Sequence, residues 1–237
     1  MLYWLIKLLV ADPALKLVLR PWVRGLDHVP ARGPAILASN HLSIIDAVVL
    51  PVVVPRRITF IAKAEFFTGR GVKGRFSAMF FRGIGQLPVD RTGGRAAEAA
   101  LAGALAVLED GELFGIYPEG TRSPDGRLYR GRTGVARIAL RSGVPVLPVA
   151  MVGTEKVIPK HRVLPRIRRV GVVVGAPLDF SDRSAQADDE TVVRAVTEEV
   201  MAAIRSLSGQ EYVDEYAARA GVNQQLARRR GRDAPER

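Results

Sequence analysis

His41 and Asp46 stand five residues apart, directly after the apolar run Ala35–Ala38. Neutral imidazole takes a proton from a hydroxyl near pH 7, and a carboxylate on its other nitrogen fixes the tautomer and stabilises the imidazolium. Five steps along one helix leave two side chains about 140° apart, so the pair requires His41 to lie in a turn before a helix begins. The two residues therefore indicate a histidine base, oriented by a carboxylate, at the end of a strand.

The same residues have a purely structural interpretation. Ser43 and Asp46 match the capping box that starts a helix. In that case Asp46 only caps the helix, and His41 only lies in the loop before it. On these residues alone, both interpretations are open.

A second candidate site is the segment Tyr117–Ser123, Tyr-Pro-Glu-Gly-Thr-Arg-Ser, which also follows an apolar run. Gly120 permits close approach of the backbone to a ligand, Thr121 and backbone amides can bond phosphate oxygens, and Arg122 offers a bidentate fork to the same anion. Glu119 is suited to holding hydroxyls or to orienting the arginine. An ordinary turn is the structural alternative, because Pro-Glu-Gly-Thr is also adequate turn chemistry.

The elements that must position these residues alternate between short apolar runs and helical patterns. Five β-like runs are bounded by Gly, Pro or charge: Ala35–Ala38, Ile58–Ala62, Glu112–Tyr117, Val144–Val152 and Val170–Val174. Three helical patterns cover Arg95–Asp110, Thr133–Arg141 and Glu190–Ser206. Strands separated by helices predict a single α/β domain with a largely parallel or mixed sheet, covered by helices on both faces.

Composition limits the partners of the chain. Its 35 basic and 24 acidic residues give a formal charge of +11, which favours anionic partners. The charge is local: Arg56–Arg95 carries nine basic and two acidic residues, whereas Asp179–Val200 carries seven acidic and two basic ones. Local anion sites therefore fit better than a continuous nucleic-acid surface. The absence of cysteine excludes a disulfide scaffold, a cysteine nucleophile and a thiolate metal site. Three histidines leave little for a histidine-rich metal centre.

The first 22 residues predict a short helical segment that lies on a membrane surface. Met1–Val10 is apolar apart from Lys7, and Asp12 with Pro13 starts a second short helix through Arg20. A helical hairpin packed on the main body is the alternative. The longest stretches without a charged residue have 13 residues, short of the roughly 20 that a spanning helix needs, so no conventional transmembrane span is predicted.

Four segments carry a resemblance to a known family: Asn40–Asp46, Gly85–Arg91, Tyr117–Ser123 and Val144–Val149. In order and approximate spacing they resemble the four blocks of the glycerolipid acyltransferases, in particular the bacterial 1-acylglycerol-3-phosphate (lysophosphatidic acid) acyltransferases. The resemblance covers roughly residues 20–208, and four ordered blocks are far more specific than any one of them. Tyr117 departs from it, since the family commonly has phenylalanine there, but the aromatic wall is kept.

The resemblance implies roles for individual residues. His41 is similar to the general base that deprotonates the free hydroxyl of the lysolipid, and Asp46 is similar to its orienting partner. The residues that resemble those holding the glycerol phosphate are Arg91, Glu119, Gly120, Thr121 and Arg122. Lys63 and Arg132 lie near these blocks in the sequence and are expected to add positive charge.

The resemblance also implies a reaction. An acyl chain passes from acyl-CoA or acyl carrier protein to 1-acylglycerol 3-phosphate, which makes phosphatidic acid in phospholipid biosynthesis. No cofactor or metal is expected, because the thioester is a co-substrate and its thiol leaves with little acid assistance. Direct transfer without an acyl-enzyme is predicted, because the chain has no cysteine and Ser43 is better explained as a cap.

Two alternatives to this reaction are open. The same blocks serve acyltransferases that use glycerol 3-phosphate, another lysophospholipid or a glycolipid as acceptor. A non-catalytic basic module that binds membranes or nucleic acid explains the charge, but it does not explain a histidine at the end of a strand.

The expected organisation has three parts: an N-terminal membrane-associating segment 1–22, an acyltransferase domain 23–210, and a C-terminal helix with a disordered basic tail 211–237. The expected partners are the lysophospholipid, the acyl thioester, a membrane surface and, for a carrier-protein donor, acyl carrier protein; nucleic acid is not expected. The expected location is peripheral, on the cytoplasmic face of the cell membrane.

Overall fold

A computed structural model describes residues 19–63, 71, 74, 86–89, 96–157, 166–218 and 220. Most of the predicted N-terminal segment and most of the basic tail lie outside these ranges. Within the described ranges, none of the helices has the length and apolarity that crossing a bilayer demands.

The centre of the fold is a seven-stranded mixed sheet in the order β1-β8-β7-β2-β5-β3-β4. Its strands are Trp22–Arg24 (β1), Ala35–Ser39 (β2), Ile58–Lys63 (β3), Gln86–Val89 (β4), Leu113–Ile116 (β5), Val146–Val152 (β7) and Gly171–Val174 (β8). All neighbouring strands are parallel except β7 and β8, so β1 and β8 run against the other five. One edge of the sheet therefore holds the ends of β2, β5 and β7 together with the starts of β1 and β8. We call it the carboxyl edge.

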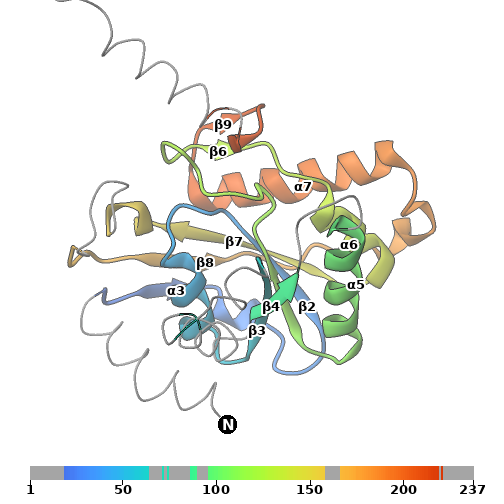
Figure 1. Cartoon of the computed structure of the whole chain (residues 1–237), viewed down its shortest axis with the longest axis horizontal. Coiled ribbons are helices and arrows are strands. Elements are labelled where there is room, and N and C mark those ends of the chain that lie inside the picture. Colours follow the sequence, from blue (N-terminus) through green and yellow to red (C-terminus); the bar gives the residue numbers. More distant parts are fainter. Residues whose placement is uncertain are drawn as a thin grey trace, which may run out of the picture.

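Helices cover both faces of this sheet. The described α-helices are Asp46–Val53 (α3), Ala96–Glu109 (α5), Gly134–Ser142 (α6) and Glu190–Ser208 (α7), with short 3-10 turns at Leu26–His28 (η2), Thr154–Lys156 (η4) and Ser181–Gln186 (η5). The start of α7 is fixed by Asp189, whose side chain accepts the backbone N–H groups of Thr191 and Val192. In Figure 1, α5 and α6 lie to the right of the sheet and α7 crosses above it.

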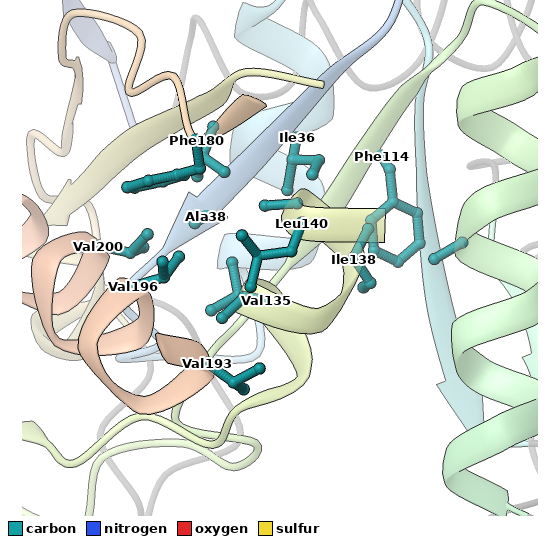
Figure 2. Packing of buried hydrophobic residues seen from close by; sticks show 14 of the residues in the cluster. Ile36, Ala38, Phe114, Val135, Ile138, Leu140, Phe180, Val193, Val196 and Val200 are labelled. Atoms are coloured by element: carbon teal, nitrogen blue, oxygen red, sulfur yellow. The ribbon is translucent and has the colours of Figure 1, made fainter. Parts of the chain in front are cut away.

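Two clusters of buried apolar side chains lie on opposite faces of the sheet. Alternate residues of β2 divide between them, with Ile36 and Ala38 in one cluster and Ala35 and Leu37 in the other. Figure 2 shows the first cluster, in which side chains of α6 and α7 meet those of β2 and β5. The second cluster packs α3 against the opposite face. The expected α/β domain, with a mixed sheet between two helical layers, is confirmed.

The predicted runs agree with the described elements to within a few residues. The strand β4 lies in the Gly85–Arg91 segment, outside the five predicted runs, and three further short strands were not predicted. Trp22, assigned from the sequence to the N-terminal helical segment, instead opens β1, where its ring packs on Gly171 of β8. The other two, Leu128–Tyr129 (β6) and Tyr212–Val213 (β9), form a separate two-stranded parallel sheet. This small sheet lies beyond α7 in Figure 1 and packs the start of the region 211–237 on the domain.

Candidate active site

Asn40 ends the central strand and turns the chain toward the site. Its buried side chain accepts the backbone N–H of Met151 at 2.7 Å and donates to the Met151 carbonyl at 3.1 Å. The amide thus takes over the pairing of β2 with β7 where the backbone ladder stops at Ser39. Asn40 also donates to the side-chain oxygen of Gln210 at 2.7 Å. These bonds fix the peptide that leads into His41.

His41 and Asp46 form a hydrogen-bonded pair at the carboxyl edge. Nδ1 of His41 lies 2.9 Å from Oδ2 of Asp46, whose side chain is fully buried, while 17% of the histidine side chain is exposed. A carboxylate accepts hydrogen bonds, so this contact assigns the proton to Nδ1 and leaves the lone pair on Nε2. Within the described chain Nε2 has no protein partner. The pair therefore presents a base whose free nitrogen is reachable from solvent.

The same carboxylate oxygen organises the turn between the two residues. Oδ2 of Asp46 accepts the backbone N–H groups of Leu42 at 2.7 Å and Ser43 at 2.8 Å. The Ser43 half of the predicted capping box does not form, because its hydroxyl is buried without a described partner and α3 begins only at Asp46. Asp46 thus has both a structural and an orienting role, since it bonds the backbone of the turn and the ring of His41.

The segment 117–123 holds the backbone of His41 from both sides. Oε2 of Glu119 accepts the N–H of His41 at 3.0 Å, and the His41 carbonyl accepts the N–H of Ser123 at 2.8 Å. The other carboxylate oxygen of Glu119 accepts the N–H of Tyr129 at 3.0 Å. The first and third blocks are therefore one unit, in which Glu119 touches the backbone of the base.

Burial changes the titration of Glu119. Its side chain is 1% exposed, and loss of solvent raises the pKa of the carboxyl from 4.5 to about 7. The two backbone N–H groups favour the charged form and oppose this rise, while the negative charges of Asp46 and Asp125 add to it. Glu119 consequently changes its charge within the range of physiological pH.

Aromatic rings form the wall beside the base. Tyr117 stacks on the His41 ring, with 4.0 Å between centroids and 16° between planes, and Phe60 stacks on Tyr117 at 5.4 Å. Gly115 makes room for this stack, because a Cβ at that position would lie 2.3 Å from the Phe60 ring. Burial and, secondarily, the charge of Asp46 raise the pKa of Tyr117 well above its usual value. The ring stays neutral and holds the imidazole plane by packing.

Two arginines flank the turn at Gly120 and have no carboxylate partner among the described residues. This glycine has φ +72°, and a Cβ there would lie 2.8 Å from Nε of Arg132. The guanidinium of Arg132 also lies over the ring of Tyr216, 5.3 Å from its centroid. Arg122 and Arg132 are exposed and have no ion pair within the described chain, whereas Arg130, also over Tyr216, pairs with Asp214 at 3.5 Å.

The start of α6 lies beside the same turn. Its N-cap residue, Thr133, makes no side-chain cap bond, so the amides of the first turn lack that partner. A Cβ on Gly134 would lie 3.9 Å from Cδ1 of Ile116, the last residue of β5. The carboxyl edge thus gathers Arg122, Arg132 and a helix N-terminus, an arrangement that attracts an anion.

The structure brings together most, but not all, of the predicted site residues. His41, Asp46, Glu119 and Gly120 contact one another or a shared neighbour, and Thr121 and Arg122 are exposed in the same turn. Arg91 lies outside the described residues, and for Lys63 only the backbone, at the end of β3, is described. In the part of the chain that the structure describes, no three His, Asp or Glu side chains gather as metal ligands.

Three contributions to the site were not predicted from the sequence: the side-chain bonds of Asn40 to Met151, and the residues Gln210 and Tyr216. Gln210 bonds Asn40 across 170 positions of the chain and donates to the Gly126 carbonyl at 2.7 Å. Tyr216 supports the arginine beside Gly120 from the region after α7. Their local sequence gives no signal, because each matters only through a partner far along the chain.

The fold and the site define a class: an α/β protein with a histidine–aspartate base at the carboxyl edge of a mixed sheet, beside an arginine-lined turn. Residues 20–152 match the sequence profile of the Acyltransferase family. The chain belongs to this family, as the four blocks led us to expect.

Named relatives agree with this assignment. The chain is 32% identical over 138 residues to the chloroplastic 1-acyl-sn-glycerol-3-phosphate acyltransferase BAT2 of Brassica napus, with 58% of the chain matched but 38% of that relative. It is 27% identical over 187 residues to a 1-acyl-sn-glycerol-3-phosphate acyltransferase of Bacillus subtilis, with 78% of the chain and 86% of the relative matched. The crystal structure of the lysophosphatidic acid acyltransferase PlsC from Thermotoga maritima superposes with a TM-score of 0.61 at 30% identity, covering 84% of this chain and 80% of that one.

Proposed function

We propose that the chain transfers an acyl group from an acyl thioester to the free hydroxyl of 1-acylglycerol 3-phosphate and so makes phosphatidic acid. The observation that carries the proposal is the His41–Asp46 pair, with Nε2 free at the carboxyl edge and cations beside it. A basic binding module has no use for a histidine oriented by a buried carboxylate. The activity named for the relatives supports the choice of acceptor.

The proposed reaction begins with a proton transfer. The acceptor hydroxyl gives its proton to Nε2 of His41, and its oxygen attacks the thioester carbonyl carbon. The charge of Asp46 stabilises the imidazolium through Nδ1 at 2.9 Å. When the tetrahedral intermediate collapses, the carbon–sulfur bond breaks and the thiolate takes the proton from the imidazolium. No group beyond the two substrates and this pair is required.

Direct transfer is the form of the reaction that we propose. The chain has no cysteine to carry the acyl group. The serines nearest the base in the chain and in the turn, Ser39, Ser43 and Ser123, are all buried, with exposed fractions of 0%, 3% and 4%. A nucleophile must reach the thioester carbon, so none of these hydroxyls suits an acyl-enzyme.

A product assay tests the proposed function. Lysophosphatidic acid, glycerol 3-phosphate and lysophosphatidylcholine are each offered with acyl-CoA and with acyl carrier protein. We expect phosphatidic acid from lysophosphatidic acid, with one free thiol released for each product molecule. Preferred acylation of another acceptor would support acyl transfer but show that 1-acylglycerol 3-phosphate is not the main substrate. No transfer from either donor to any acceptor would contradict the proposal.

The acceptor phosphate is expected to bind between Arg122 and Arg132, at the start of α6. Arg132 has no carboxylate partner in the described part of the chain, and it packs against Gly120 and the ring of Tyr216. Removing a charge-assisted bond to phosphate costs about 1.5 to 3 kcal/mol, so Arg132→Ala should raise KM for lysophosphatidic acid about 10-fold to 100-fold with little change in kcat. Initial rates over a range of acceptor concentrations at saturating donor measure this.

Arg130→Ala is the matched control for that substitution. Arg130 also lies over Tyr216, but it pairs with Asp214 at 3.5 Å and with Glu198 at 4.0 Å. We expect its KM for the acceptor to stay within about twofold of wild type, because exposed ion pairs contribute little. Equal changes in KM for the two variants would show that neither arginine binds the phosphate.

A further inference from the structure

One surface of the carboxyl edge combines apolar and basic side chains in a way that the proposed reaction does not use. Ile44 and Ile167 are the large hydrophobic residues that stand out as exposed in the described chain, at 58% and 77%. Ile167 lies between Arg166 and the pair Arg168–Arg169, all of them exposed and without an ion pair in the described chain. We call these five residues the docking face. A single exposed isoleucine is ordinary, so only their common position carries meaning.

Sheet topology places the two isoleucines on the same edge. Ile44 follows the end of β2, in the turn that carries His41. Residues 166–169 lead into β8, whose first residue, Gly171, pairs with Val152 at the end of β7. Only β7 separates β8 from β2, so these two strands lie about 10 Å apart in the sheet and their turns emerge at the same edge. In Figure 1 this edge lies to the left, beside α3.

Backbone contacts fix the basic segment against this edge. The N–H of Arg166 donates to the Val157 carbonyl at 2.8 Å. Gly153 packs on the Arg169 carbonyl, which would lie 3.5 Å from a Cβ at that glycine. The backbone that carries these arginines is therefore fixed against the fold. Glu155, the acidic residue between β7 and this segment in the described chain, is itself paired with Lys156 at 3.9 Å.

We propose that the docking face binds the surface of an anionic phospholipid bilayer and holds the catalytic edge of the sheet against it. Arginines pair with lipid phosphates, and isoleucines become buried at the boundary between headgroups and acyl chains. A nucleic acid offers phosphates but no comparable apolar layer for the isoleucines. The choice of a lipid partner rests on the proposed function, because a lysolipid acceptor resides in that surface. Contact at this edge lets the acceptor reach His41 without leaving the membrane.

The start of the described chain fits this orientation. The Val170 N–H donates to the Leu19 carbonyl at 3.3 Å, and the Trp22 N–H donates to the Val170 carbonyl at 3.0 Å. Residues 19–22 thus meet the chain directly after the docking face. The segment predicted from the sequence to lie on a membrane is covalently joined to the domain at this point.

Vesicle sedimentation of the full-length chain, without substrates, tests the proposal. The vesicles are phosphatidylcholine alone or with about 30 mol per cent phosphatidylglycerol. Arg168→Ser with Arg169→Ser should weaken binding to the anionic vesicles about 30-fold, because each basic residue near such a surface contributes about fivefold. The matched control, Arg32→Ser with Arg205→Ser, removes the same charge from exposed positions off the docking face and should bind as wild type does. Ile167→Ser should weaken binding about 10-fold, with the loss persisting in about 0.5 M NaCl.

Several results would overturn the proposal. Equal losses in the two double variants would show a general charge effect, and unchanged binding in all variants would assign the contact to another part of the chain. Tighter binding of a DNA duplex than of anionic vesicles would make the face a nucleic-acid surface. Because no acceptor or donor is present, these outcomes are separate from those of the product assay. A variant that loses vesicle binding but still acylates a dispersed short-chain acceptor would separate the two completely.

Discussion

His41→Ala should lower kcat for phosphatidic acid formation about 10³-fold while the protein stays folded. A positioned general base contributes about 10² to 10⁴ in rate, and the bond to Asp46 orients His41 for that role at the carboxyl edge. The fold should survive, because the backbone of His41 is held through its N–H and carbonyl rather than through the imidazole. Initial rates with lysophosphatidic acid and acyl-CoA, together with thermal unfolding, measure the two effects.

Asp46→Asn separates the charge of the aspartate from its geometry. His41, Leu42 and Ser43 all bond the same oxygen, Oδ2, while Oδ1 has no described partner. An amide can place its oxygen at Oδ2 and keep the three bonds, so this variant loses mainly the negative charge that stabilises the imidazolium. We expect kcat to fall about 10²-fold with little change in the melting temperature.

His28→Ala is the control for both substitutions. His28 bonds the Val174 carbonyl at 3.0 Å from the short turn η2, away from the site. Its activity should equal that of wild type. Wild-type rates in His41→Ala would remove the base from the proposed mechanism, and a collapse of folding in that variant would leave Asp46→Asn as the test.

Much of the scaffold could be predicted, because buried strands and capped helices leave local patterns in the sequence. The run Ala35–Ala38 is uniformly apolar and becomes a central strand whose residues are all buried. The pattern Glu190–Ser206 has an N-cap at Asp189 and a glycine at 209, and α7 covers Glu190–Ser208. Strands of two or three residues, such as β6 and β9, carry too few residues for a periodic signal, so tertiary pairing alone defines them.

The site was predictable only in part, for a related reason. Residue types identified His41 and Asp46, and the structure joins them at 2.9 Å. The structural role of Glu119 was not evident from the sequence, since a carboxylate in a glycine-containing turn suits ligand binding equally well. Direct contact of Glu119 with the substrate stays a prediction. In the structure both of its oxygens bond backbone N–H groups, one of them on His41, 78 positions away. Contacts over such separations depend on strand order, which no local pattern encodes.

Glu119 links the stability of the site to pH. The pKa of its carboxyl is about 7 in the folded protein, above the ordinary value of 4.5, so the folded state binds a proton more tightly than the unfolded chain does. Its contribution to stability is therefore full below pH 4.5 and is lost as the pH rises through 7. The difference corresponds to about 3 kcal/mol in the free energy of unfolding, an upper figure set by the pKa shift.

Glu119→Gln should remove this pH dependence and slow catalysis. A glutamine offers one acceptor oxygen to two N–H donors, so either His41 or Tyr129 loses its bond. A small displacement of the base costs about 10²-fold in rate, and we expect kcat to fall by that order. Between pH 5 and 8, the unfolding free energy of wild type should fall relative to the variant by up to about 3 kcal/mol.

Urea unfolding of both proteins across this pH range isolates the Glu119 contribution, because every other titrating group is common to the two and cancels in the difference. Glu112→Gln provides the matched control, since Glu112 is exposed just before β5, at the opposite end of that strand from the site. Its curve should run parallel to that of wild type, and its kcat should be unchanged. Parallel curves for wild type and Glu119→Gln would show instead that the buried carboxyl keeps its ordinary pKa, and with it that the bonds to His41 and Tyr129 offset the cost of burying its charge.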